Sequence, residues 1–590
     1  MVTATCRQRA GNEAGRESSR NDASMSAAYL EILRRVYAAD VARQTADSII
    51  ELVRVARARI EPDKHILSSD DIVLITYGDS IRKTGCSPLA ALRDFYRQFL
   101  ADSMNSIHIL PFHPFTSDDG FSVVDYYSID PALGDWSDIE MLGADTRLMF
   151  DAVINHISSS SVWFKSFMSG DEKYADWFIE VDPQEDLSMV TRPRALPLLT
   201  EMSDESGKKH HIWTTFSDDQ VDLNFANPQV LLALLQVLLF YLSKGAKFIR
   251  LDAIAFVWKQ IGTNCIHLPQ THDLVRLIRR VVEDVNAATM IVTETNVPHE
   301  ENMAYFGDGY DQAHMVYNFA LPPLVAHSLL AGSATKLLRW AQELRLPSDQ
   351  TCFFNFTASH DGIGIRPIES LLTRDEVRLL LSATEDRGGL ISYSQDTKGN
   401  RFPYELNISF ADLLSSPDDT DDLRARRLLA SQAIALAMPG VPAVYIHSLL
   451  GSRNDLLAVK QRKCKRAINR STLGLDKLRA QLADRSSFRS MVFTQMVELL
   501  KTRRCARAFD PYGEFSFPDI DERLFSVLRK WEGHSVLCLT NVSSTSVLIG
   551  LELPMSSARE LISGTDVSLN EVCVPGYGTL WLDMKGNQEN

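Results

Sequence analysis

Residues 248–253 read Phe-Ile-Arg-Leu-Asp-Ala, a short apolar run that ends at two charged side chains, Arg250 and Asp252. Runs of this kind, rich in β-branched residues, recur along the chain and alternate with longer segments of helical pattern. Short, nearly continuous apolar strands are typical of a parallel sheet covered by helices. The eight runs are Ile72–Thr76, Ile107–Leu110, Leu148–Ile154, Phe248–Leu251, Met290–Thr293, His314–Tyr317, Phe353–Thr357 and Val441–Ile446. Eight such strands predict an α/β fold, a (β/α)8 TIM barrel.

The spacing of the runs predicts how the rest of the chain is organised. Two gaps, from Asn155 to Phe248 and from Thr357 to Val441, are too long for a single helix. After residue 508, short β-type runs separated by Gly, Ser and Asn turns predict antiparallel strands. The predicted parts are an N-terminal tail and helical extension (1–68), the barrel (69–156 and 218–508), an inserted domain after strand three (157–217), an inserted loop region after strand seven (363–430) and a small C-terminal antiparallel β domain (509–590).

Composition excludes several classes of function. The chain of 590 residues has 76 acidic and 61 basic side chains and a formal net charge of −15, which argues against a nucleic-acid surface. There is no apolar stretch of about 18 residues that would span a membrane, and no secretory signal is visible. The eight cysteines include no CxxC pair, which favours a reducing, cytoplasmic compartment. No cluster of His, Cys and acidic residues has a metal-ligand spacing, so we expect no metal.

Polar side chains follow four of the eight runs directly. Run three ends at Asn155 and His156, run four at Asp252, run five at Glu294, and run seven at Asp361. An Asp after one strand is more often a turn or helix-cap residue, so each alone is weak evidence. In a barrel the carboxyl ends of the strands form one face, where the chemistry takes place. The four ends together therefore predict an active site.

The carboxylates have the properties that a double displacement at a sugar carbon requires. Arg250 and Asp252 are two residues apart on one strand, so both point to the same side, and the guanidinium is expected to keep Asp252 ionised. An ionised carboxylate is the nucleophile of a retaining mechanism, in which the two carboxyl groups stand about 5–5.5 Å apart. Glu294 ends the next strand and is the candidate general acid and base.

These strand ends resemble the conserved regions of a known family. The strings DAVINH (151–156), RLDA (250–253), TET (293–295) and SHDG (359–362) are similar to those of glycoside hydrolase family 13, the α-amylase superfamily, and in particular to its sucrose-phosphorylase-like branch. Within the branch, TETNVPHEEN (293–302), FGDG (306–309), YELN (404–407) and HSLLGSRND (447–455) resemble glucosylglycerate phosphorylases most. The resemblance covers about residues 70–585.

The resemblance implies roles for several further residues. Asp361 would be a third carboxylate that stabilises the oxocarbenium-like state. The remaining glucose site would consist of His156 and His360 as hydrogen-bonding partners, Asp118 as a wedge, Phe121 as a stacking platform and Arg470 as the partner of the glucose hydroxyls and Asp118.

A phosphorylase also needs an anion site beside the glucosyl-enzyme. Arg192 and Arg194 lie in the loop after strand three, and Tyr404 lies in the loop after strand seven. The planar fork of an arginine suits phosphate because it forms bidentate, charge-assisted hydrogen bonds. By resemblance, one of these arginines and Tyr404 bind inorganic phosphate as a co-substrate, and the sequence leaves open which arginine does so. No cofactor is expected.

Two departures from sucrose phosphorylases bear on the acceptor site. Those enzymes have His at the position of Asn296 and Gln at the position of Glu405, and by resemblance both positions line the acceptor site. A fructose site is therefore in doubt, whereas a small acceptor such as glycerate is compatible. Arg366, just after the HDGIG turn, is the cation expected to face the carboxylate of such an acceptor.

The predicted function is that of a retaining glycoside phosphorylase. It would convert an α-glucoside, with 2-O-α-D-glucosylglycerate favoured, and phosphate reversibly into α-D-glucose 1-phosphate and the acceptor. Sucrose phosphorylase, or a related α-glucosyl hydrolase or transglucosylase, is the alternative. A barrel that only binds sugar is disfavoured because Asp252, Glu294 and Asp361 are all present. The expected partners are small molecules, with neither nucleic acid nor membrane, and a homodimer is left open.

Overall fold

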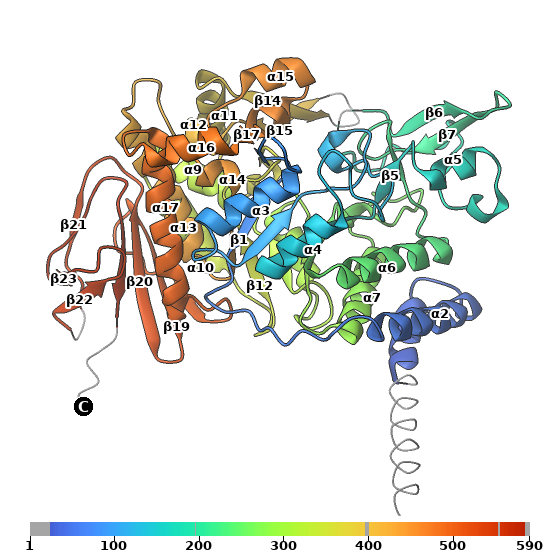
Figure 1. Ribbon diagram of the computed structural model, residues 1–590, viewed down its shortest axis with the longest axis horizontal. Coiled ribbons are helices and arrows are strands. Elements are labelled where there is room, and N and C mark those ends of the chain that lie inside the picture. Colours follow the sequence, from blue (N-terminus) through green and yellow to red (C-terminus); the bar gives the residue numbers. More distant parts are fainter. Residues whose placement is uncertain (1–23, 195, 396–399, 553–554, 585–590) are drawn as a thin grey trace, which may run out of the picture.

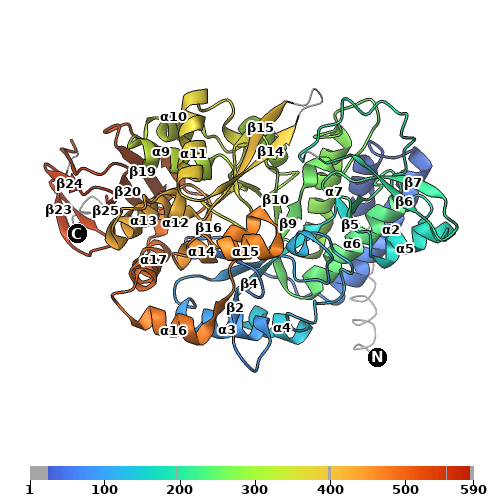
Figure 2. The ribbon, with the colours of Figure 1, turned by 90° about the horizontal axis from the view of Figure 1, so that it is seen from above.

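The computed structural model describes residues 24–194, 196–395, 400–552 and 555–584, and its centre is a closed barrel of eight parallel strands. The strands follow one another around the barrel in chain order, and the last pairs with the first (Figures 1 and 2). They are β1 (Val73–Thr76), β3 (Ser106–Ile109), β4 (Arg147–Val153), β9 (Ala246–Asp252), β10 (Met290–Thr293), β11 (Met315–Tyr317), β12 (Cys352–Asn355) and β16 (Val441–Tyr445). The predicted (β/α)8 barrel is confirmed.

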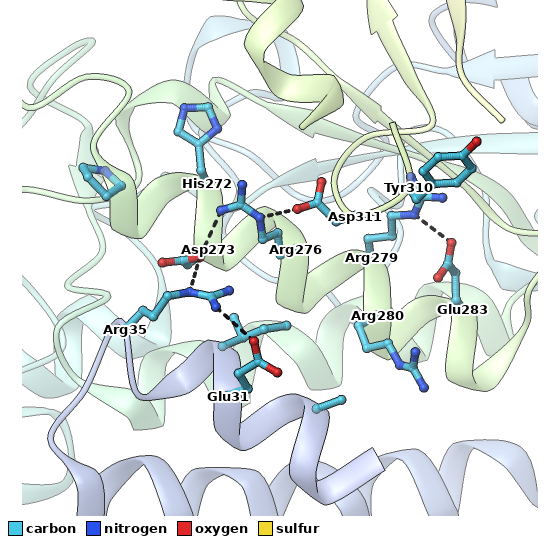
Figure 3. Close-up of a pocket in the computed structure, with 13 residues that line it drawn as sticks. Glu31, Arg35, His272, Asp273, Arg276, Arg279, Arg280, Glu283, Tyr310 and Asp311 are labelled. Carbon is cyan, nitrogen blue, oxygen red and sulfur yellow. Dashed lines mark hydrogen bonds and ion pairs between the residues drawn. The ribbon is translucent and has the colours of Figure 1, made fainter. Parts of the chain in front are cut away.

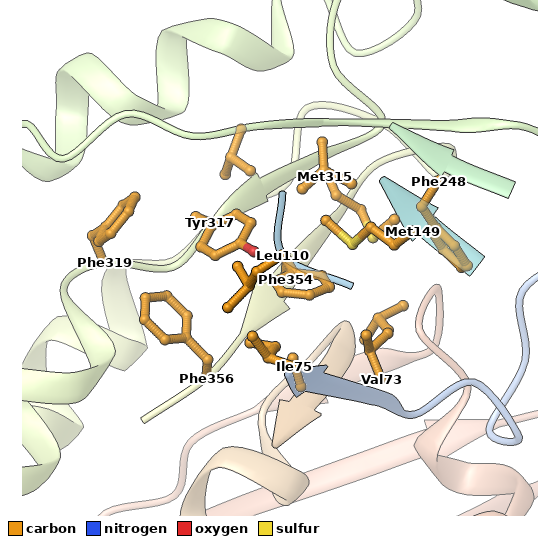
Figure 4. Close-up of a cluster of buried hydrophobic side chains, with 14 of the residues drawn as sticks. Val73, Ile75, Leu110, Met149, Phe248, Met315, Tyr317, Phe319, Phe354 and Phe356 are labelled. Carbon is orange, nitrogen blue, oxygen red and sulfur yellow. The ribbon is translucent and has the colours of Figure 1, made fainter. Parts of the chain in front are cut away.

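Large apolar side chains fill the barrel. Met149, Phe248, Met315 and Phe354 gather at its centre, and the Tyr317 ring lies next to Phe354 with ring centroids 4.6 Å apart (Figure 4). Each fully buried side chain of this size contributes about 1.5–3 kcal/mol to folding, so the interior is a packed core and leaves only the strand ends for a site. The longer helices of the barrel part are α3 (Pro88–Phe99), α4 (Trp136–Asp145), α6 (Pro228–Ser243), α7 (Pro269–Val285), α9 (Leu321–Ala331), α10 (Thr335–Glu343), α13 (Asp421–Ala437) and α17 (Phe488–Cys505).

The long gap after β4 contains small structural elements of its own. Its first strand, β5 (His156–Ser158), pairs antiparallel with its last strand, β8 (Gln220–Asp222). Between them lie α5 (Val162–Met168), η2 (Glu172–Tyr174) and the antiparallel pair β6 (Leu199–Ser203) and β7 (Lys209–Trp213). The β5–β8 pair brings both ends of the excursion back to the barrel beside the end of β4.

The second long gap, after β12, contains a small sheet and two helices. The elements are β13 (Ile363–Gly364), η5 (Arg366–Ile368), α11 (Arg374–Asp386), β14 (Leu390–Gln395), β15 (Arg401–Asn407) and α12 (Phe410–Leu413). The sheet has the order β13-β15-β14, which brings Tyr404 and Glu405 next to the turn after Asp361. Helix α13 begins at Asp421, inside the predicted insert of 363–430, and packs against β16 and α17.

The chain beyond β16 returns to the catalytic face and then forms the C-terminal sheet. Its elements are α14 (Ile446–Leu449), α15 (Leu456–Arg462), η6 (Lys465–Asn469), β17 (Leu473–Gly474), which pairs with β2 (Ile81–Arg82), α16 (Leu475–Ala483) and η7 (Arg507–Phe509). The C-terminal strands are β18 (Glu514–Ser516), β19 (Leu524–Trp531), β20 (His534–Asn541), β21 (Val547–Ile549), β22 (Ser557–Glu560), β23 (Asp566–Ser568), β24 (Val572–Val574) and β25 (Thr579–Asp583). A six-stranded antiparallel sheet confirms the predicted β domain.

The N-terminal extension packs against the outside of the barrel. Residues 24–33 are helical, and α2 (Ala39–Arg57) follows and contacts α6 and α7. Tyr29 donates a hydrogen bond to Asp284 (2.6 Å), and Arg35 pairs with Asp273 (2.9 Å). The extension is thus anchored to α7 by polar contacts as well as by buried apolar side chains. Residues 1–23 of the predicted tail lie outside the described residues.

A cavity of about 830 Å³ lies between this extension and α7, on the outside of the barrel (Figure 3). It is rich in arginine, but each guanidinium has a carboxylate partner. The pairs are Arg35 with Asp273, Arg276 with Asp273 and Asp311, Arg279 with Glu283, and Arg280 with Asp284. The positive charges that line this cavity are therefore paired with carboxylates. None of the site residues predicted from the sequence lines this cavity.

Candidate active site

The three carboxylates expected from the sequence line one cavity at the carboxyl ends of the strands. Asp252 is the last residue of β9, Glu294 directly follows β10, and Asp361 lies in the turn between β12 and β13. The cavity has a volume of about 60 Å³. Its lining residues are Asp118, Phe121, His156, Arg194, Phe216, Gln220, Asp252, Ala253, Glu294, Asn296, His360, Asp361, Tyr404 and Arg466.

Arg250 lies between the carboxylates near the ends of β4, β9 and β10. Its guanidinium is 2% exposed, donates to Asp252 at 2.7 Å, and also forms an ion pair with Asp151. The other terminal nitrogen lies 3.9 Å from Glu294. The alternation of side chains along β9 places Arg250 and Asp252 on the same side, as the two-residue spacing predicts. The guanidinium of Arg250 therefore lies within ion-pair distance of both Asp252, the candidate nucleophile, and Glu294, the candidate acid.

The backbone after the nucleophile holds the second carboxylate. The N–H of Ala253 donates to Oε2 of Glu294 at 3.0 Å. To do so, Ala253 adopts a left-handed conformation with φ of +49° and ψ of +30°, which costs a residue with a side chain roughly 1–2 kcal/mol. A strained residue is kept where the surrounding structure over-determines it, and here it links β9 to the end of β10.

Burial raises the pKa of both Asp252 and Glu294, while Arg250 lowers it for both. For Asp252 the net direction of the pKa shift is upward, so burial outweighs Arg250, against the expectation that the guanidinium keeps this carboxyl ionised. The two groups oppose each other's ionisation, so the pair holds one proton more readily than two free acids would. Because Arg250 is 2.7 Å from Asp252 and 3.9 Å from Glu294, the negative charge belongs on Asp252 and the proton on Glu294.

These protonation states predict a bell-shaped dependence of kcat/KM on pH. Activity rises as Asp252 loses its proton and falls again as pH rises through the pKa of Glu294, which must stay protonated to act as an acid. Because burial raises both pKa values, we expect the alkaline limb to lie well above the ordinary carboxyl range. Initial rates across pH 4–10 measure both limbs. An alkaline limb near pH 4.5 would contradict the raised pKa of Glu294.

Asp361 lies among positive groups. Its carboxylate is 2.6 Å from Arg466, 3.5 Å from His360 and 3.9 Å from Arg470. Burial opposes its ionisation, but the two permanent cations beside it, Arg466 first and then Arg470, hold its pKa well below the usual range. Asp361 is therefore the carboxylate of the three that stays charged throughout, the property that a stabiliser of positive charge needs.

Phe121 and the two histidines form one wall. The rings of Phe121 and His360 stack with centroids 4.8 Å apart and planes 4° from parallel, and Arg250 lies over the Phe121 ring at 5.6 Å. His156 Nε2 contacts the carbonyl of Phe121 at 2.9 Å and Gln220 at 3.1 Å. Burial lowers the pKa of His156 to about 4 and that of His360 to about 3, so both are neutral near pH 7.

Several buried polar atoms around the cavity have no hydrogen-bond partner within the described chain. They are Asn296 Oδ1, His360 Nδ1 and Arg470 Nη2. Buried polar atoms are normally hydrogen-bonded, and leaving one unpaired costs about 1–3 kcal/mol. A cluster of unpaired donors and acceptors beside three carboxylates is suited to a polyhydroxylated ligand, whose hydroxyl groups both donate and accept.

The expected pairing of Arg470 with Asp118 is wrong. Arg470 forms its ion pair with Asp119 and donates to the carbonyl of His360 at 2.8 Å. Asp118 faces the cavity and pairs with Arg194 at 2.8 Å. Both aspartates have positive φ, 52° and 51°, so the loop turns sharply and sends the two neighbouring carboxylates to different cations. Sequence spacing alone does not show which of two adjacent aspartates enters a site.

The structure separates the two arginines that the sequence left equivalent. Arg194 lines the cavity, whereas Arg192 is exposed. Tyr404 also lines the cavity, and burial raises its pKa to about 12, so its hydroxyl is a neutral donor. Arg194 and Tyr404 therefore share the cavity of the three carboxylates.

Of the three residues predicted for the acceptor site, one lines the cavity and two do not. Asn296 lines the cavity. Glu405 does not: its side chain is buried, accepts the N–H of Gly362 at 2.8 Å and pairs with Arg466 at 2.9 Å. Arg366 begins η5 and does not line the cavity either; its positive charge lowers the pKa of Glu369 and of His267.

Sequence reasoning missed Arg466. This residue lies in η6, lines the cavity, and contacts both Asp361 and Glu405. The available signal was its position four residues before Arg470 in the string RAINR, in a segment already selected for Arg470. Among the described residues, no group of His, Cys, Asp and Glu is arranged to hold a metal ion. The described helices include none long and apolar enough to cross a bilayer.

A closed barrel with an arginine-bridged carboxylate pair and a third acid at its strand ends defines a glycoside-active barrel enzyme. Residues 99–361 match the α-amylase catalytic domain. The chain is 44% identical to the glucosylglycerate phosphorylase of Escherichia coli K12, over 87% of this chain and 91% of that protein. The chain belongs to the glucosylglycerate phosphorylase group of the α-amylase family.

The sucrose phosphorylases of the family that were compared are more distant. The sucrose phosphorylase of Streptococcus mutans is 29% identical, over 78% of this chain and 92% of that protein. The crystal structure of sucrose 6F-phosphate phosphorylase from Thermoanaerobacter thermosaccharolyticum superposes with a TM-score of 0.71 at 25% identity, covering 86% of this chain and 98% of that one.

Proposed function

We propose that this chain is a retaining glycoside phosphorylase that converts 2-O-α-D-glucosylglycerate and phosphate reversibly into α-D-glucose 1-phosphate and glycerate. The observation that carries the proposal is the placement of Arg194 and Tyr404 in the cavity of Asp252, Glu294 and Asp361. An amylase-type hydrolase needs the carboxylates alone, whereas a phosphorylase also needs donors for an anion. The identity to glucosylglycerate phosphorylase supports the choice of substrate.

The first half of the reaction breaks the glycosidic bond. A carboxylate oxygen of Asp252 attacks the anomeric carbon, and Glu294 gives its proton to the departing glycerate oxygen. Positive charge develops on the sugar ring in the transition state, where the permanently charged Asp361 stabilises it. The products are a glucosyl ester of Asp252, free glycerate and an ionised Glu294.

The second half transfers the glucosyl group to phosphate. The carboxylate of Glu294 takes a proton from the incoming phosphate, whose oxygen attacks the anomeric carbon and releases Asp252. Arg194 and Tyr404 would hold the phosphate through charge-assisted hydrogen bonds. Two inversions at one carbon retain the α configuration. In this scheme inorganic phosphate is a co-substrate, and the chemistry needs no cofactor.

Sucrose phosphorylase is the alternative, and two observations weigh against it. The sucrose phosphorylases are more distant relatives than the glucosylglycerate phosphorylases. Asn296 in the cavity and a Glu rather than Gln at 405 depart from the pattern for fructose. A cytoplasmic location is part of this proposal, in keeping with the free thiols of the described cysteines, and the homodimer stays a prediction.

A phosphate-release assay tests the proposal. The purified protein is incubated with α-D-glucose 1-phosphate and one acceptor at a time: D-glycerate, fructose or glycerol. We expect D-glycerate to release phosphate fastest and to give a product that the enzyme and phosphate convert back. A clear preference for fructose would assign the chain to sucrose phosphorylases.

Arg194→Gln should raise the KM for phosphate by roughly tenfold or more, the loss expected when a charge-assisted hydrogen bond is removed. Water then competes better for the glucosyl-enzyme, so the ratio of free glucose to glucose 1-phosphate should rise. The same change at the exposed Arg192 is the matched control and should leave both quantities near the wild-type values. If Arg192→Gln shifts the product ratio and Arg194→Gln does not, the assignment is reversed.

A further inference from the structure

Arg466 is a second cation of the cavity to which neither the sequence nor the proposed reaction has given a function. It lies in η6, in the chain segment after β16, and its side chain lines the cavity together with Arg194. Its Nη1 is 2.6 Å from Asp361, while Nε and Nη2 contact the two oxygens of Glu405 at 3.2 and 2.9 Å. A guanidinium has five N–H donors, so donors remain beyond these three contacts.

The proposed reaction brings an anion to the position beside Glu294 in each of its two halves. Glycerate and phosphate occupy the same position in turn, because each exchanges a proton with Glu294 and each is bonded to the same anomeric carbon. Both are anions, and an anion taken from water into a closed cavity needs charge-assisted donors to offset its desolvation. Arg366, the cation predicted for the acceptor carboxylate, does not line this cavity.

The charges of Arg466 and Arg194 act on the same groups of the cavity. Both arginines lower the pKa of the Tyr404 hydroxyl, and Glu294 raises it. Both arginines also lower the pKa of Asp118. Both guanidinium groups line the same cavity as Glu294, and each pairs with a carboxylate of the glucose site, Arg194 with Asp118 and Arg466 with Asp361.

We propose that Arg466 is the second cation of the anion site and binds the carboxylate of the acceptor, and that Glu405 positions it. The inference rests on the proposed function and adds the residue that makes the enzyme prefer a negatively charged acceptor to a neutral one. It also accounts for Glu405, which is 3% exposed and fixed by the N–H of Gly362 at 2.8 Å. A carboxylate holds both Nε and Nη2 of Arg466, whereas the single acceptor oxygen of glutamine cannot hold both and Gly362 as well.

The test compares a charged and a neutral acceptor in the same variant. Glucosyl transfer from α-D-glucose 1-phosphate to D-glycerate and to glycerol gives two values of kcat/KM, and their ratio is the charge preference. Arg466→Gln should lower this ratio by about tenfold or more, as expected for the loss of a charge-assisted hydrogen bond. Rates with both acceptors should fall because Arg466 also contacts Asp361, but the ratio cancels that common loss.

Lys465→Gln is the matched control. Lys465 is the adjacent cation of η6, contacts the carbonyl of Ile391 at 2.7 Å and does not line the cavity, so its removal should leave the ratio unchanged. A fall of similar size in Lys465→Gln would show a general charge effect and overturn the assignment to Arg466.

Glu405→Gln tests the positioning role. We expect the ratio of kcat/KM with glycerate to that with glycerol to fall several-fold, because the orientation of Arg466 is loosened, and the ratio cancels any loss common to both acceptors. Arg466→Gln is used only if circular dichroism shows that it folds. If it does not fold, the ratio of kcat/KM for glycerate to that for glycerol in Glu405→Gln tests the inference, and a ratio equal to that of the wild type overturns it. A wild-type enzyme without preference for glycerate would refute the proposed function, whereas a wild-type preference that survives in Arg466→Gln refutes only the role of Arg466.

Discussion

Asp252→Asn is expected to lower kcat by roughly four orders of magnitude or more, because an amide cannot form the glucosyl ester on which both halves of the reaction depend. The protein should still fold. Arg250 keeps its ion pair with Asp151, so no unpaired charge is left in the barrel. Since burial raises the pKa of Asp252, removing its charge relieves a cost at neutral pH, and the Tm should stay the same or rise slightly. Steady-state rates and thermal unfolding measure the two effects.

Asp311→Asn provides a matched control for that experiment. Asp311 pairs with Arg276 beside the large outer cavity, remote from the strand ends, and its substitution should leave kcat near the wild-type value. Retention of a sizeable fraction of activity by Asp252→Asn would remove the nucleophile from β9. A collapse of the Tm would mean that the loss of activity reports on folding.

Glu294→Gln is expected to produce the second largest effect, a loss of roughly 10²–10⁴-fold with glucosylglycerate, the usual contribution of general acid catalysis. The loss should be much smaller with α-D-glucosyl fluoride, since fluoride departs without a proton. The amide can still accept the hydrogen bond from Ala253, so the geometry of the site is retained. Parallel measurements of kcat/KM with the two donors give the comparison.

Glu301→Gln serves as its control. Glu301 lies on α8 (His299–Met303), pairs with His267 and does not line the cavity. Its substitution should affect neither donor. Equal losses with both donors in Glu294→Gln would indicate that the residue is structural and not an acid.

The barrel and the carboxylates were predictable because both follow from local sequence patterns. A buried parallel strand needs a continuous apolar run. The polar residues that follow the run lie at the carboxyl end of the strand, on the catalytic face of the barrel. This logic places Asp252, Glu294 and Asp361 in one cavity without any knowledge of the loops. The same logic gives the side on which Arg250 lies.

The contacts between loops were not predictable in this way. Asp118 and Asp119 differ in partner because of two positive φ values that no sequence pattern specifies. Arg366, at the start of η5, does not line the cavity, whereas Arg466 lines it from η6, which packs against β15. The net rise in the pKa of Asp252 likewise depends on burial, which a strand pattern indicates only qualitatively.

The left-handed Ala253 also determines which oxygen of Glu294 carries the proton. A protonated carboxyl group has one hydroxyl and one carbonyl oxygen, and only the carbonyl oxygen is a good acceptor. Because Oε2 accepts the N–H of Ala253, the proton belongs on Oε1. The peptide bond next to the nucleophile thereby fixes the direction of proton delivery, so the stereochemistry of protonation is a property of the main chain and would survive changes to the side chains around it.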